Sequence, residues 1–109
     1  MEIERSTFYR AQHITGPAAV LVSIKFGNMP VEGPTVLRIL SKQMIDPAPK
    51  FDVENHLAEI LAGVAQANHE LDGQLEVQAV EITPDDYPKK SQVQHIAYKI
   101  ACAVLKNQV

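Results

Sequence analysis

A long amphipathic segment in the middle of the 109-residue chain limits the folds open to it. Between residues 52 and 72, apolar side chains recur every three or four positions, the period of a helix with one buried face. The stripe consists of Val53, Leu57, Ile60, Leu61, Val64, Ala67 and Leu71. Asp52 is suited to cap the helix N-terminus, and Gly73 to end the helix in a left-handed conformation. Because such a helix buries its stripe only against another layer, the rest of the chain must supply that layer.

Two segments before this helix have the pattern of β-strands. In residues 19–26 the side chains of Val20, Val22 and Ile24 share one face, as alternation along a strand requires. Residues 7–14 carry β-branched and aromatic side chains near both ends. The short break between the two segments therefore predicts an antiparallel hairpin.

A strand and a second helix are expected after residue 73. Residues 74–82 alternate between apolar and polar, but the alternation slips from Val80 onward, which predicts a bulge or an edge position. The last amphipathic stretch runs to about Lys106. Its start is marked by Ser91 and Gln94, which have the spacing of a capping box.

Residues 35–45 are ambiguous between helix and strand. The apolar positions have a helical spacing, and we favour a helix here. The β-rich run from residue 36 to residue 40 leaves a strand as the alternative. In either case the segment must end near Asp46, because prolines occupy positions 47 and 49.

These elements predict a single α+β domain over residues 1–109, in the order β-β-α-α-β-α. A small, largely antiparallel sheet of about three strands would carry the amphipathic helices on one face. Such a thin sheet has two open edges, and exposed edges in natural proteins tend to be covered or paired. We therefore expect a homo-oligomer that joins its sheets.

Composition excludes several classes of protein. The net charge of −3 argues against nucleic-acid binding, which relies on clustered basic side chains to neutralise phosphates. The lone thiol, Cys102, can form neither an internal disulfide nor a thiolate metal cage. The longest uninterrupted apolar stretch, residues 17–22, is too short to cross a membrane, and no secretory leader is evident. We expect a cytoplasmic protein that does not contact membranes.

Charge is unevenly distributed along the chain. Residues 51–73 hold five acidic and no basic residues, whereas residues 87–109 hold four lysines and no acidic residue. One interpretation places the two helices side by side, with opposite charges flanking their shared seam. The other assigns the charged faces to a protein partner, because complementary potentials orient association.

Six residues are candidates for a ligand site, because they are polar or titratable and lie in loops or at the ends and faces of elements. They are His13, Asn28, His56, Asp85, Asp86 and His95. For each histidine a structural position at the surface or at the edge of the core is the favoured interpretation, and for the two aspartates a turn is favoured. No histidine pair has metal-ligand spacing on one helix, and no phosphate-loop or dinucleotide motif occurs. We expect no metal and no cofactor.

The apolar patterns of the chain are explained by packing of helices and strands, and no recognised catalytic signature is present. The sequence therefore favours a small, soluble, non-catalytic interaction or ligand-binding module that associates with itself. The alternative is a small enzyme whose site is assembled between protomers from the histidine and aspartate candidates.

Overall fold

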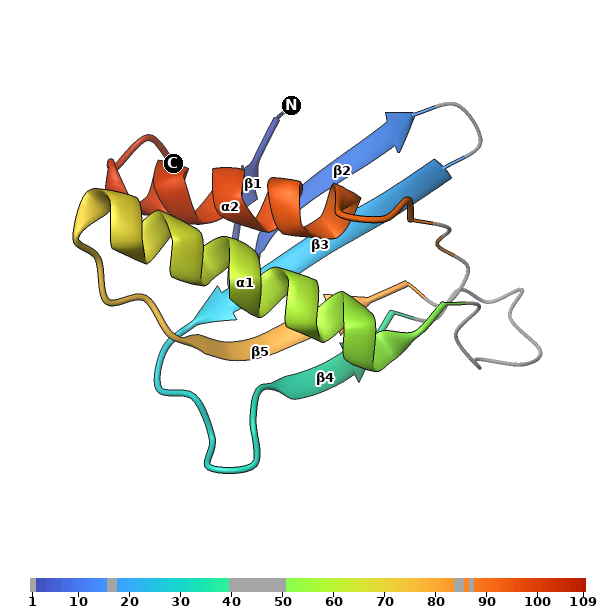
Figure 1. The fold of residues 1–109 in the computed structure, drawn as a ribbon, viewed down its shortest axis with the longest axis horizontal. Helices are drawn as coiled ribbons and strands as arrows, with labels where there is room; N and C mark the ends of the chain where they lie inside the picture. Colours follow the sequence, from blue (N-terminus) through green and yellow to red (C-terminus); the bar gives the residue numbers. More distant parts are fainter. Residues whose placement is uncertain (1, 16–17, 40–50, 84–85, 87) are drawn as a thin grey trace.

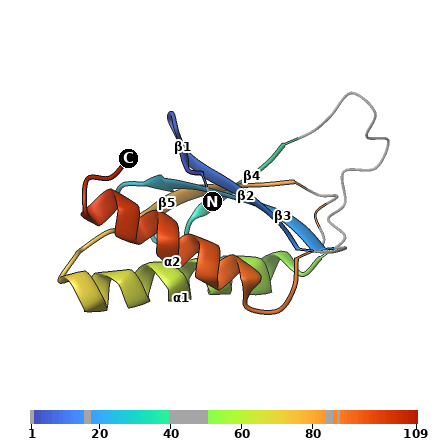
Figure 2. The same ribbon diagram turned by 90° about the horizontal axis from the view of Figure 1, so that it is seen from above.

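A computed structural model of the protein describes residues 2–15, 18–39, 51–83, 86 and 88–109. Its elements are β1 (Glu4–Arg5), β2 (Tyr9–Thr15), β3 (Ala18–Phe26), β4 (Thr35–Arg38), α1 (Val53–Leu71), β5 (Val77–Ile82) and α2 (Gln92–Leu105). The strands form one sheet, and both helices pack on the same face of it (Figures 1 and 2). No described helix covers the opposite face. The predicted α+β class, with helices on one face, is confirmed.

The sheet is larger and more mixed than the sequence indicated. Its strand order is β1-β2-β3-β5-β4, so five strands replace the predicted three. The β2–β3 hairpin is antiparallel, as predicted, and β5 pairs with β3 in the same sense. The pairing of β4 with β5 is parallel, because the connection between them passes through α1 on the helical face. The predicted order and the largely antiparallel sheet are corrected accordingly.

The favoured helix at residues 35–45 is wrong where the structure describes the segment. Residues 35–38 form β4, and Val36 and Arg38 align with Val80 and Ile82 of β5. Pairing with a distant strand has overridden a local helical spacing, and the β-rich alternative is confirmed. Residues 40–45 lie outside the described residues.

The phase slip predicted near Val80 is a bulge. Lys25 aligns with Ala79, but the next residue of β3, Phe26, aligns with Val77, so Gln78 is the extra residue on β5. The bulge lets Val77 and Val80 face the helices together. It lies on an interior strand and not at an edge.

The ends of the helices agree only partly with the sequence signals. The side chain of Asp52 accepts hydrogen bonds from the backbone N–H groups of Glu54 and Asn55, so the predicted cap of α1 is confirmed. At the other end it is Asp72, not Gly73, that adopts the left-handed conformation, with φ 53°. The predicted capping box of α2 is wrong, because Ser91 has φ 66° and forms no side-chain cap bond.

The core lies between the helices and the sheet. Its fully buried members from α1, α2, β3 and β5 include Val20, Val22, Ile24, Ile60, Val80, Val93, Ile96 and Ile100. The two helices approach each other closely at Gly63, where an added Cβ would lie 2.8 Å from the backbone nitrogen of Tyr98. The acidic and basic helices are therefore neighbours within one fold, as the first interpretation of their charges expected.

Candidate functional site

The uncovered face of the sheet carries one aligned residue from each strand. Strand registers place these residues in a line across the sheet, which we call the transverse row. The row consists of Glu4, Arg10, Ser23, Glu81 and Leu37. Its members on β1, β2, β3 and β5 are polar, and its member on β4, at the edge of the sheet, is a leucine.

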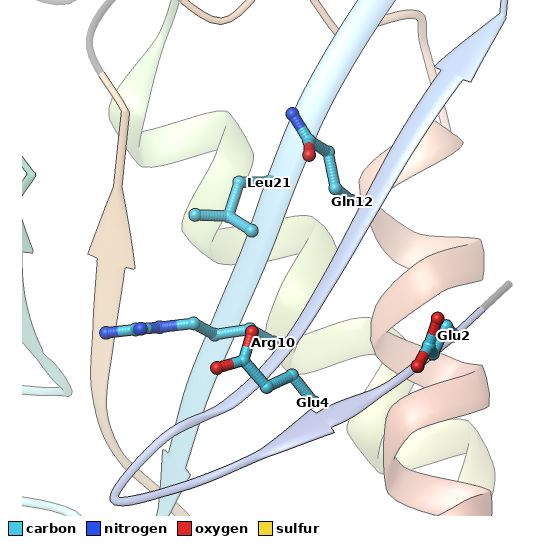
Figure 3. A pocket seen from close by; sticks show the side chains of 5 residues that line it. All are labelled: Glu2, Glu4, Arg10, Gln12 and Leu21. Carbon is cyan, nitrogen blue, oxygen red and sulfur yellow. The ribbon is translucent and has the colours of Figure 1, made fainter.

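A hydrogen-bonded network holds the middle of the row. Arg10 donates to Glu81 Oε1 from Nε at 2.9 Å and from Nη2 at 2.7 Å. The hydroxyl of Ser23, which is fully buried, donates to the same oxygen at 2.6 Å. The guanidinium thus reaches over β3 to β5, as Figure 3 shows. Charge-assisted bonds of this kind are stronger than neutral ones, and the network ties three strands together.

We expect Glu81→Ala to lower the free energy of unfolding by about 2 kcal/mol, because it leaves the buried Ser23 hydroxyl and Arg10 without their acceptor. Glu81→Gln keeps an acceptor oxygen and should cost less. Glu4→Ala removes an exposed carboxylate from the same row and should change stability by less than about 0.5 kcal/mol. Urea unfolding measures all three. Equal losses for Glu81→Ala and Glu4→Ala would contradict this role for the network.

Beside the network lies a shallow hollow of about 500 Å³. It is lined by Glu2, Glu4, Arg10, Gln12 and Leu21 (Figure 3). These residues include no nucleophile, and the one apolar wall is Leu21. The hollow offers hydrogen-bonding and charged groups on an open surface, which is typical of a contact face rather than of an enclosed ligand pocket.

The β4 edge of the sheet combines an edge strand with exposed apolar side chains. β4 is the last strand of the sheet, and it pairs only with β5 among the described residues. Leu37 is 45% exposed. The 27–34 loop, which leads into β4 and projects past this edge in Figure 1, carries Met29 at 42% exposure and a fully exposed Val31. A helical interpretation of residues 35–45 hides this surface, because the surface exists only when β4 joins the sheet.

His56 is buried on α1 with a relative exposure of 2%. Neither ring nitrogen has a hydrogen-bond partner among the described residues, and the ring lies 5.0 Å from that of Phe51. Burial lowers the pKa of His56 from 6.5 to about 4, so the imidazole is neutral at pH 7. A hollow of about 160 Å³ lies beside it, but less than 1 Å² of either ring nitrogen is accessible. A ligand there could not bond to the ring.

Two other candidates have structural contacts. His13 lies on β2, and the side-chain amide of Gln92 donates to its Nδ1 at 3.0 Å, which joins the sheet to the start of α2. The carboxylate of Asp86 accepts the backbone N–H of Leu21 at 2.8 Å. Asp86 thereby satisfies a donor of β3 beyond the residues that pair with β5.

The remaining candidates lie apart. His95 is exposed on α2 and lines a separate hollow with Tyr98. The pKa of Tyr98 is raised, chiefly by a side-chain hydrogen bond with Glu70 and secondly by one with Cys102. Asn28 is exposed in the 27–34 loop.

Asp85 lies outside the described residues. Among those described, His56 and His95 line different hollows, and neither His13 nor Asp86 lines either one. No group of three or more metal-ligating side chains is found in the described part of the chain. These described candidates therefore do not share either hollow. A site shared between protomers stays a prediction.

No family model, curated protein or solved structure matches the chain at a significant level. None of the described helices has the length and apolar character needed to span a membrane.

Proposed function

We propose that the protein is a non-catalytic interaction module that associates with itself through the β4 edge of its sheet. One observation carries the proposal. Among the described residues, four large apolar side chains are exposed, and three of them, Met29, Val31 and Leu37, lie in β4 or in the loop that leads into it. Clustered apolar exposure marks interaction sites, and a strand edge supplies backbone groups for pairing.

The opposite edge of the sheet supports this choice of β4. It is formed by β1, which is only two residues long, Glu4 and Arg5, and both are charged. Short, charged edge strands are a common protection against pairing. The β4 edge is four residues long and presents an exposed leucine beside its one charged residue, Arg38.

The surroundings of three candidate residues also favour binding over catalysis. The carboxylate of Asp86 bonds to the backbone of β3, and the ring of His13 bonds to the start of α2. The ring nitrogens of His56 are sealed from solvent. A general acid or base must reach a substrate within hydrogen-bond distance, and these groups are occupied or enclosed.

Native mass spectrometry at increasing protein concentration tests the proposal. We expect species of two or more chains, each of 12.0 kDa, whose share rises with concentration. An unrelated protein of similar mass, added to the same solution, controls for clustering during electrospray and should not enter these species. Single chains alone at every concentration would overturn the proposal.

A further inference from the structure

We propose that the partner at this edge is a second copy of the chain, whose β4 pairs antiparallel with the first about a two-fold axis at Leu37. This inference rests on the proposed function and specifies its geometry. Two-fold dimers are the commonest homo-oligomers, and their interfaces must be self-complementary. The backbone of β4 determines which self-complementary registers are possible.

The hydrogen bonds to β5 show which backbone groups of β4 are free. The N–H of Ile39 donates to the carbonyl of Ile82 at 2.8 Å, so Ile39 directs its backbone groups toward β5. Successive residues of a strand direct these groups to opposite sides, so every second residue faces the same side. Leu37 therefore also faces β5, and Val36 and Arg38 direct their N–H and C=O groups to the open edge.

A two-fold axis at Leu37 uses all of these outward groups. In that register Val36 lies opposite Arg38 of the second copy, and Arg38 lies opposite the other Val36. Each is a hydrogen-bonded pair that exchanges two bonds, which gives four bonds in total by the antiparallel rule. The two Leu37 residues then form the closely spaced, non-hydrogen-bonded pair, with their side chains in contact.

Other two-fold registers are poorer. An axis at Val36 would set Arg38 opposite Pro34 of the copy, and proline has no N–H to donate. An axis at Arg38 would place the two guanidinium groups directly opposite each other, which is destabilising. Among the axes at Val36, Leu37 and Arg38, the sequence of β4 therefore favours Leu37.

Both faces of the joined sheet fit this register. On the uncovered face, the exposed ends of the two transverse rows meet, and each Leu37 buries the other. On the helical face, where Val36 is half-buried, the aliphatic stem of the partner's Arg38 can cover it while the charged head stays in water. The projecting 27–34 loop would flank the partner's strand (Figure 1).

This contact is short, so the dimer should be weak. Four residues per strand and one loop bury less than a standard interface of about 1,600 Å². We expect association that varies with concentration rather than an obligate dimer.

Disulfide trapping in a Cys102→Ser background tests the register. In the proposed dimer the two Leu37 Cα atoms are about 4.5 Å apart, within the range that a disulfide spans. The two Val36 residues are diagonal neighbours about 8 Å apart, beyond that range. Val36→Cys is therefore a matched control one residue away. Mild oxidation with a glutathione redox couple, followed by non-reducing electrophoresis, reports the cross-link.

We expect Leu37→Cys to cross-link at least about tenfold faster than Val36→Cys, given these distances. Equal or faster cross-linking of Val36→Cys, in a chain that does associate, would overturn the register and leave the proposed function intact. A wild-type chain that stays monomeric would overturn the proposed function itself. Circular dichroism of both variants verifies that each is folded.

Discussion

Gly63→Val should lower the free energy of unfolding by about 3 kcal/mol, the upper range for overpacking a tight contact. A Cβ at this position would lie 2.8 Å from the backbone nitrogen of Tyr98 and closer still to the carbonyl oxygen of Gln94. Both are backbone atoms of α2, so the contact can be relieved only if the helices separate. Gly63→Ala should have the same sign and a smaller size, about 2 kcal/mol.

Helix propensity alone predicts that Gly63→Ala raises the free energy of unfolding. The sign of the measured change therefore distinguishes the two effects. In an exposed helix interior, replacing glycine with alanine stabilises by about 1 kcal/mol. Ala62→Gly, one residue away on the exposed side of α1, supplies the matched control and should cost about 1 kcal/mol. Thermal and urea unfolding compare the three variants. A stabilised Gly63→Ala would show that α1 and α2 are not in contact at this point.

The second large effect is a loss of stability in acid caused by His56. Its pKa is about 4 in the folded protein and 6.5 as the ordinary value. Between these values the unfolded chain binds a proton that the folded chain does not, so unfolding becomes more favourable as pH falls. We expect about 3 kcal/mol of stability to be lost between pH 6.5 and pH 4, with no contribution from His56 above that window.

His56→Leu isolates this contribution. The leucine cannot titrate, so the variant should lose about 3 kcal/mol less than the wild type over the same window. Carboxylates that titrate in this range are common to both proteins and cancel in the difference. At pH 7 the variant should be at least as stable, because it removes two buried nitrogens that have no described partner. Parallel stability–pH curves for the two proteins would contradict a buried, neutral His56.

The parts of the fold that the sequence predicted are those set by local patterns. The apolar stripe and Asp52 together define α1 and its start, because a helix forms its hydrogen bonds within four residues. The hairpin of β2 and β3 follows from alternation and a short break. Asp72, rather than Gly73, takes the left-handed position, since aspartate also tolerates that conformation.

The part that the sequence did not predict depends on contacts between distant residues. Val36 and Leu37 fit a helix and a strand equally well over so short a run, and pairing with β5, more than 40 residues later, decides between them. The network of Arg10 and Glu81 joins residues 71 positions apart. Nothing in the sequence relates Arg10 to Glu81, and only the strand order and register place them in one row.

The candidate site shows the same division. His56 borders the apolar stripe of α1, so its burial could be anticipated from the helical period, but its lack of partners could not. Leu37 gave no signal as a surface residue, because the face it occupies exists only once β4 has joined the sheet. A strand assignment for residues 35–38 would have revealed an alternation in which Leu37 points away from the helices.

Sedimentation equilibrium of the wild type beside two lysine variants tests self-association through β4 most directly. Leu37 and Leu71 are both exposed leucines, at 45% and 37%, but Leu71 ends α1 far from the β4 edge. We predict a monomer–dimer equilibrium for the wild type and for Leu71→Lys, and monomers alone for Leu37→Lys, with all three folded. Dimerisation of Leu37→Lys as strong as that of the wild type, or a wild type that stays monomeric at its highest soluble concentration, would contradict the account.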